Sequence, residues 1–264
     1  MDYKKYFEGN GWNDASGIEF RLLDGENSKG FLETYMEYVS RDFNGNPFLK
    51  VLKLNGERVV GSNPFAVALV NDILKYQGIR TATQKELEKI LDSGFDLKGR
   101  FEDTGLVLRS VNDSLNPKNN SIASYIAKLA SLWGYEFDGD YPLVLELSGL
   151  NLKNLDNSYG LGFDLMNEVD MYNVSGYSYK NNRKMFSGLD ERALPVDIRD
   201  ISQDLLSKIK GPQNFLDKGI RVLFTRKDGL SRMILGDILD LSTDGDKLAD
   251  SYPESQIVLV RDKT

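Results

Sequence analysis

The residues best suited to binding chemistry lie in one aromatic and basic segment, Tyr172 to Phe186. Tyrosine rings can stack on flat groups, lysine and arginine can contact phosphate or carboxylate, and asparagine can bond to the edges of bases and sugars. From Tyr177 to Phe186 there are three cations and no acid, in a chain of net charge −7. The candidate binding residues are Tyr172, Tyr177, Tyr179, Lys180, Arg183 and Lys184. We expect them to recognise an anionic partner, which is a nucleotide, a nucleic acid or an acidic ligand.

The same composition also fits a second interpretation. An exposed strand and loop could pack its tyrosine rings on the body of the protein and leave its charges solvated. Downstream, the stretch from Leu205 to Lys227 holds six cations against Asp217 alone. If the two basic stretches fold together, they would form one positive face.

Three carboxylates upstream of this segment suggest a different chemistry. Asp164, Glu168 and Asp170 are separated by even numbers of residues, so they share one face if residues 163–174 form a strand. Carboxylate oxygens are the ligands that Mg²⁺ and Mn²⁺ prefer, and a bound metal can activate water. The alternative hypothesis is therefore a metal-dependent hydrolase or nuclease, with Mg²⁺ as its possible cofactor.

The chain has no cysteine and no histidine. A disulfide, a thiolate nucleophile, a cysteine-based metal site and an imidazole proton shuttle are therefore excluded. Among short motifs, the triplet Asp103-Thr-Gly105 follows Phe101-Glu102 rather than an apolar run and has no second copy, which argues against an aspartic protease. Whether the protein is an enzyme stays open.

The remaining composition is that of a globular protein, with 41% apolar and 28% charged residues. No run approaches the roughly 18 apolar residues of a membrane span, and the first residues lack the apolar core of a signal peptide. We therefore expect a cytoplasmic protein that does not contact a membrane. The acidic excess lies in residues 101–170, which hold 11 acids against 4 bases. A third hypothesis is a structural or assembly subunit whose edge strands pair with a protein partner.

Two hairpins are predicted among the elements that must position these groups. In Gly219 to Asp237, two apolar runs flank Lys227-Asp228-Gly229, which is typical of a tight reversal. In the second, Phe48–Leu54 and Glu57–Val60 are joined by Asn55-Gly56, the pair favoured in a two-residue type I′ turn.

Helices are predicted where apolar residues recur at helical spacing between capping signals. Asn63 and Pro64 begin one helix that ends at Gly78, and Thr83 with Glu86 forms the capping box of another that ends at Gly94. The predicted helices cover residues 29–41, 64–77, 83–93, 121–133 and 201–209. The predicted strands outside the hairpins cover residues 17–24, 105–111, 141–148, 163–174 and 256–260.

The order of these elements mixes hairpins with helical crossovers, which favours an α+β fold over a regular doubly wound one. We expect a mixed, largely antiparallel sheet covered by four to five helices. Residues 1–264 are expected to form a single compact domain, with a possible seam between two lobes near residues 134–160.

Overall fold

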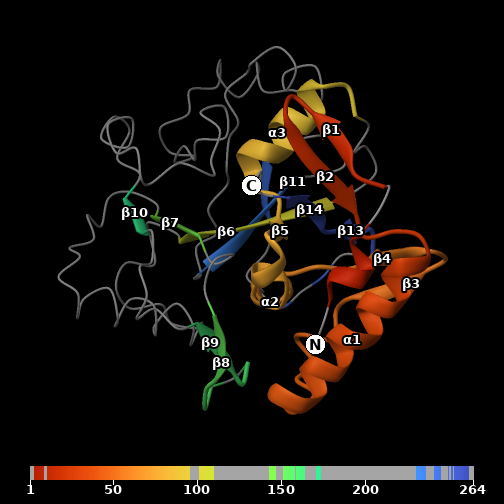
Figure 1. Cartoon of the computed structure of the whole chain (residues 1–264). Helices are drawn as coiled ribbons and strands as arrows, with labels where there is room; N and C mark the ends of the chain where they lie inside the picture. The colour runs from red at the N-terminus through yellow and green to blue at the C-terminus, as the bar shows by residue number, and fades with distance from the viewer. Residues whose placement is uncertain are drawn as a thin grey trace.

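The structure is a computed structural model that combines helices with mainly antiparallel sheets, as the sequence predicts (Figure 1). It describes residues 3–8, 11–95, 101–109, 143–146, 151–157, 159–163, 171–173, 230–235, 241–244, 249, 251 and 253–261. These residues contain three α-helices rather than the four to five predicted. The two further predicted helices, at 121–133 and 201–209, lie outside the described residues.

The three helices begin at the capping signals or close to the predicted positions. They are α1 (Glu26–Asp42), α2 (Pro64–Leu74) and α3 (Gln84–Asp92), accompanied by the 3-10 helices η1 (Lys4–Tyr6) and η2 (Lys75–Gln77). Asn63 caps α2, because its side chain accepts the Ala66 N–H at 2.8 Å. The Thr83–Glu86 capping box is present in full. None of the helices in these ranges has the length and apolar composition needed to cross a bilayer.

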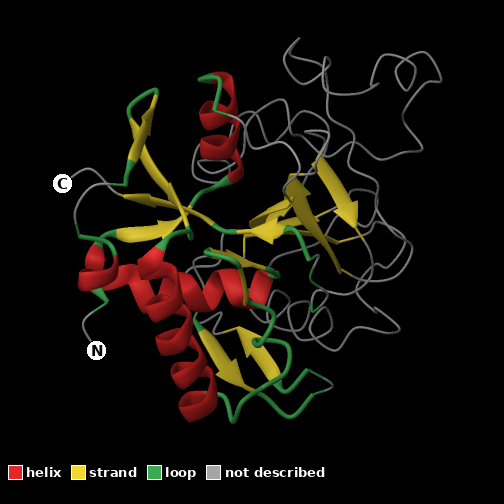
Figure 2. Ribbon diagram, turned by 90° about the vertical axis from the view of Figure 1, so that its right-hand side faces the viewer, coloured by secondary structure: helices red, strands yellow, loops and turns green. Residues whose placement is uncertain are grey.

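A four-stranded antiparallel sheet lies between the helices. Its order is β1 (Asn13–Ala15), β2 (Ile18–Leu22), β14 (Val258–Arg261) and β5 (Ile79–Thr81). In Figures 1 and 2, α1 and α2 lie on one side of this sheet and α3 on the other. The predicted strand at 17–24 is confirmed as β2, and the predicted strand at 256–260 is confirmed as β14 from Val258 onward; the two strands are neighbours although they lie at opposite ends of the chain.

The second main sheet has six strands. Its order is β10 (Met171–Asn173), β7 (Leu143–Glu146), β6 (Phe101–Arg109), β11 (Leu230–Leu235) and β12 (Leu241–Asp244), with β13 (Ser255–Gln256) paired to β6. The β13–β6 ladder is parallel and all the others are antiparallel. The second arm of the hairpin predicted at 219–237 is β11, whereas its first arm lies outside the described residues.

Two small hairpins complete the fold. In the first, β3 (Lys53–Asn55) and β4 (Arg58–Val60) pair so that Asn55 faces Arg58. The turn residues are therefore Gly56 and Glu57, one position later than predicted. Gly56 has φ +62° and Glu57 does not have a positive φ, which is the pattern of a type II′ turn rather than type I′. Residues 48–52 form turns before β3, not the predicted first half of a strand.

The second hairpin, β8 (Leu152–Asn154) with β9 (Leu161–Phe163), was not predicted, because Gly160-Leu161-Gly162 has the composition of a flexible loop. The hairpin packs on the body through Phe163, which is fully buried and stacks on Phe65 at 5.5 Å between ring centroids. Asn46 fixes its turn by donating to Tyr159 O at 2.8 Å. The hairpin therefore belongs to the main core.

The main core lies between α1, α2 and one face of the four-stranded sheet. It includes residues from α1 and α2 together with Ile79, Ile257 and Leu259. Phe20 projects from the other face of the sheet, where its ring packs against the ring of Phe95, a residue that follows α3. The two ring centroids are 4.7 Å apart. Both faces of this sheet are therefore covered.

One buried asparagine joins three distant parts of the chain beside this core. Besides capping α2, Asn63 donates from Nδ2 to Phe48 O at 2.9 Å and to Ala249 O at 3.1 Å. Next to it, Gly61 has φ +91°, and a Cβ there would overlap the Val51 carbonyl oxygen. A larger residue at position 61 would therefore strain the backbone there and push the chain away from Val51.

Candidate functional site

The predicted binding segment begins at an outer strand of the six-stranded sheet. Tyr172 is the central residue of β10, where it pairs with Val144 of β7, and in the described part of the sheet β10 has β7 as its only neighbour. The other five candidate binding residues, Tyr177, Tyr179, Lys180, Arg183 and Lys184, lie outside the described residues. Their mutual arrangement, and that of the basic stretch at 205–227, therefore stays a prediction.

The predicted metal ligands Asp164, Glu168 and Asp170 also lie outside the described residues. The strand proposed to align them runs from residue 163 to 174, and its two ends are β9 and β10. These strands belong to different sheets, since β9 pairs with β8 and β10 pairs with β7. Within the described ranges, no three His, Cys, Asp or Glu side chains come close enough to hold a metal ion.

The triplet Asp103-Thr-Gly105 forms a bulge in the middle of β6. Val107 pairs with Arg232 and Asp103 with Ile234, so three residues of β6 face one residue of β11. Gly105 provides the positive φ of +70°, and its N–H donates to Asp103 Oδ1 at 3.2 Å. Asp103 is only 3% exposed, so a substrate in solution does not reach its carboxylate. The triplet therefore shapes the strand.

The structure brings together a group of tyrosines and cations that sequence reasoning missed. They come from the N-terminal segment, the second half of α1 and the end of α2 with η2. We call this the tyrosine–cation surface; its residues are Lys5, Tyr6, Tyr38, Arg41, Lys75 and Tyr76, and Tyr3 is buried next to them. The signal was available as two Lys-Tyr dipeptides and a Tyr and Arg three residues apart on one helix.

Each cation of this surface lies over a tyrosine ring. Lys5 Nζ is 4.8 Å from the Tyr6 ring centroid, the Arg41 guanidinium carbon 5.0 Å from that of Tyr38, and Lys75 Nζ 5.1 Å from that of Tyr76. These distances are within the range of cation–π attraction. Tyr76 is 85% exposed, so its ring is available to a partner.

Carboxylates neutralise two of these three cations. Asp42 forms two hydrogen bonds with Arg41, at 2.6 and 2.9 Å, and Asp72 contacts Lys75 Nζ at 2.5 Å. The bond from Arg41 lowers the pKa of Asp42, and the bond to Asp72 raises the pKa of Lys75, so Asp42 and Lys75 are both charged at neutral pH. Burial, followed by the neighbouring acids Asp72 and Asp42, raises the pKa of Tyr38. The surface therefore has little net charge with which to attract an anion.

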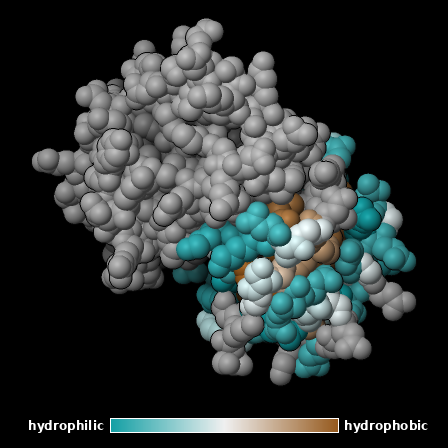
Figure 3. Space-filling model, turned by 90° about the horizontal axis from the view of Figure 1, so that it is seen from above, coloured by the Kyte–Doolittle hydropathy of each residue, from teal (hydrophilic) through white to brown (hydrophobic). Residues whose placement is uncertain are grey.

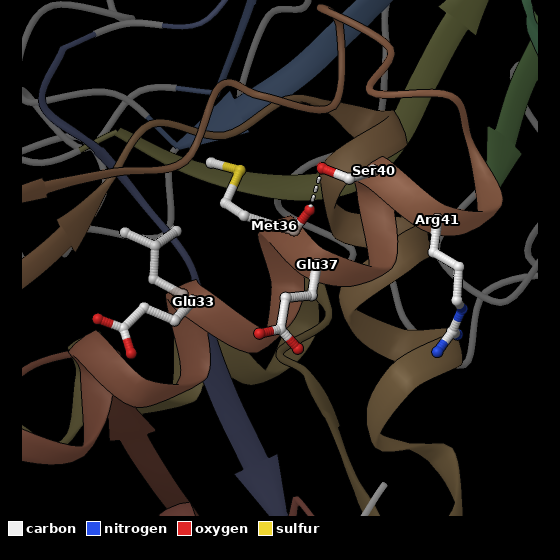
Figure 4. A pocket seen from close by; sticks show the side chains of 6 residues that line it. Glu33, Met36, Glu37, Ser40 and Arg41 are labelled. Atoms are coloured by element: carbon white, nitrogen blue, oxygen red, sulfur yellow. Dashed lines mark hydrogen bonds between the residues drawn. The ribbon is translucent and has the colours of Figure 1, made fainter.

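A shallow groove of about 750 Å³ runs along α1 next to this surface (Figure 4). Leu32 and Met36 are half-buried, whereas Glu33 and Glu37, which line the same groove, are exposed. Ser40 is turned back onto the helix, where its hydroxyl donates to Met36 O at 2.8 Å. Among the described residues, the lining is not part of any group of three acidic side chains that could hold a metal ion. The described surface seen from above is likewise mostly hydrophilic, with a small apolar area (Figure 3).

Comparison of the chain with protein-family models, with curated proteins and with solved structures gives no match.

Proposed function

We propose that the protein binds an anionic ligand, namely a nucleotide, a nucleic acid or an acidic small molecule, through segment 172–186. The observation that carries the proposal is the charge pattern of residues 177–186, three cations and no acid in a chain of net charge −7. Lys180, Arg183 and Lys184 would contact phosphate or carboxylate, and the tyrosines would stack on a base.

Two structural observations favour segment 172–186 over the tyrosine–cation surface as the binding site. The cations of the tyrosine–cation surface are mostly paired with acids, as shown by the Arg41–Asp42 and Lys75–Asp72 contacts. The segment also starts at β10, an outer strand in the described order of the sheet. A strand of a packed sheet provides a rigid base, and binding residues commonly lie close to the end of such a strand.

The test is a comparison of two double variants with the same net charge. Arg183→Ala with Lys184→Ala removes two cations of the segment, and Lys53→Ala with Lys89→Ala removes two exposed lysines elsewhere. Fluorescence anisotropy would measure the binding of a labelled single-stranded oligonucleotide and of a labelled nucleotide at several salt concentrations. We expect weaker binding and a smaller salt dependence only in the first variant.

If the two variants lose affinity equally, the binding reflects net charge rather than this segment. If wild-type protein binds neither probe, an acidic small molecule is the remaining ligand class, and a thermal-shift screen of carboxylates and phosphates would test it. The proposal is contradicted if the screen gives no shift, or if the first variant keeps the wild-type shift.

A second candidate function, self-assembly, is favoured by the exposure of Tyr76. Tyrosine and arginine are enriched at protein interfaces, and both occur on the tyrosine–cation surface. Its balanced charges, with Arg41 beside Asp42 and Lys75 beside Asp72, suit contact with a second copy that presents the same residues.

Sedimentation velocity over a range of protein concentrations would test self-assembly. We expect Tyr76→Ala to shift the protein towards monomer. The matched control is Leu54→Ala, since Leu54 is 43% exposed and is the other large apolar side chain exposed in the described part of the chain. A wild-type protein that stays monomeric at all concentrations would rule this role out.

A further inference from the structure

One short segment near the end of the chain belongs to both main sheets. Ser255 and Gln256 form β13 and pair with Phe101 and Glu102 of β6 in the six-stranded sheet. After a single residue, Ile257, the chain continues as β14 in the four-stranded sheet. We call Ser255–Arg261 the clasp. It lies beside β2 and β5, which precede it by more than 170 residues (Figure 1).

The clasp occupies an interior position in the four-stranded sheet. Val258 and Val260 pair with Leu22 and Phe20 of β2, and on the other side Leu259 pairs with Thr81 of β5. Without β14, therefore, β2 and β5 would each lose a ladder of hydrogen bonds. No other strand in the described part of the sheet joins them.

The clasp is also fixed by burial and by bonds outside its ladders. Six consecutive residues are between 0% and 6% exposed, and they are Ser255, Gln256, Ile257, Val258, Leu259 and Val260. Gly61 N–H donates to Ser255 O at 2.6 Å, and Ala82 N–H donates to Val258 O at 2.7 Å. Ile257 and Leu259 belong to the main core. The bond to Ser255 O lies near the six-stranded sheet, and the bond to Val258 O lies at the end of β5. The clasp is therefore held at both sheets.

We propose that the clasp is a conformational link that opens and closes as a unit and so couples the two sheets. When it leaves, the ladders that it forms with β2, β5 and the first two residues of β6 are lost together, whereas β2 keeps its pairing with β1 and β6 keeps its pairing with β11. A change that loosens β13 on the six-stranded sheet therefore loosens β14 between β2 and β5. This inference does not depend on the proposed ligand.

Native-state hydrogen exchange of the full chain tests the link. Exchange would be followed by mass spectrometry in increasing, sub-denaturing urea for residues 18–22, 79–81, 101–103 and 255–261. We expect these four segments to exchange by one shared opening reaction, with the same urea dependence, before the protein unfolds globally. Separate urea dependences for β14 and for the beginning of β6 would overturn the proposal.

A pair of core variants tests whether a change in the clasp reaches both sheets. Ile257→Ala and Val39→Ala both remove buried apolar groups from the main core, where these side chains are 2% and 0% exposed. We expect Ile257→Ala to speed exchange in all four segments by the same factor, roughly tenfold or more, and to leave α1 unchanged. Val39→Ala should speed exchange in α1 without changing residues 101–103.

If Ile257→Ala changes β2 and β5 but not residues 101–103, the sheets open independently and the proposal is wrong. The urea series on the wild-type protein supports or overturns the link even if the Ile257→Ala variant does not fold.

Discussion

Asn71 on α2 pairs with Thr81 on β5 through both atoms of its side-chain amide. Its Oδ1 accepts the Thr81 N–H at 2.7 Å, and its Nδ2 donates to Thr81 Oγ1 at 3.0 Å. β5 lies at one end of the four-stranded order, with β14 on its other side. The amide therefore takes the place of a neighbouring strand and satisfies a backbone donor on this side of β5.

Replacement of Asn71 by leucine should leave the buried Thr81 N–H without this acceptor. We expect a loss of about 1–3 kcal/mol in the free energy of unfolding, the usual cost of an unsatisfied buried group. Urea denaturation followed by circular dichroism measures it. Asn71→Asp keeps the acceptor and should lose less; equal losses in the two variants would contradict the role of the Thr81 N–H bond.

The ion pair between Arg80 and Glu86 should make stability depend on acid pH. The two terminal guanidinium nitrogens of Arg80, Nη1 and Nη2, each donate to the Glu86 carboxylate at 2.7 Å. Thr83 donates to the same carboxylate from its N–H and its hydroxyl, each at 2.9 Å. Burial alone would raise the pKa of Glu86, but the bonds from Arg80 and Thr83 outweigh it and lower this pKa below the ordinary value of 4.5. The stabilisation is therefore complete above pH 4.5 and is lost as the pH falls through the folded-state pKa.

Glu86→Gln should consequently destabilise the protein most near neutral pH. We expect a loss of about 1.5–3 kcal/mol there, typical of a hydrogen bond to a charged group, and a difference from wild type that narrows as the pH falls into the acid range. Urea midpoints across this range check the prediction. Glu254→Gln, at an exposed position, is the control and should show no such trend. A constant difference would assign the effect to packing rather than charge.

The proposed stacking role of Tyr172, Tyr177 and Tyr179 predicts different effects of aromatic and aliphatic substitutions. Phenylalanine keeps the ring, whereas leucine removes it. We expect each leucine variant to weaken oligonucleotide binding by about 1–3 kcal/mol at a position that stacks on a base, and each phenylalanine variant to bind almost normally. Anisotropy titrations decide this, and similar losses in both series would point to the hydroxyl groups instead.

Removal of divalent cations distinguishes the proposed anion site from the metal hypothesis. Binding through Lys180, Arg183 and Lys184 needs no metal, so EDTA should leave the affinity for the oligonucleotide unchanged. A loss of binding or any hydrolysis that returns with Mg²⁺ or Mn²⁺ would instead favour Asp164, Glu168 and Asp170. Calorimetric titration of the metal-free protein with each cation provides the second readout.

Local chemistry made a large part of the fold predictable. The Asn63 and Thr83 caps, the end of η2 at Gly78 and the apolar spacing of α3 are each determined by neighbouring residues, and the structure confirms them. The turn at Gly56 was placed one residue early, because the sequence favours Asn-Gly while the register is set by the pairing of Asn55 with Arg58.

Other features depend on contacts that a sequence does not reveal. Gly162 suggested flexibility, but a Cβ there would overlap the side chain of Leu155, so glycine serves close packing in β9. The position of β14 between β2 and β5 likewise follows from tertiary pairing rather than from local propensity. For the candidate site, the sequence identifies the charges of residues 177–186, but whether they share one face depends on the three-dimensional fold.

The bond from Asn63 Nδ2 to Ala249 O has a consequence for biosynthesis, because the two residues are 186 positions apart. At roughly 5–20 residues per second, a ribosome needs on the order of ten to forty seconds to make the intervening chain. During this time α2, of whose eleven residues nine are buried in the finished protein, has no partner from residues 249–261. The nascent chain should therefore be a substrate for chaperones that hold apolar segments until residues 249–261 have been made.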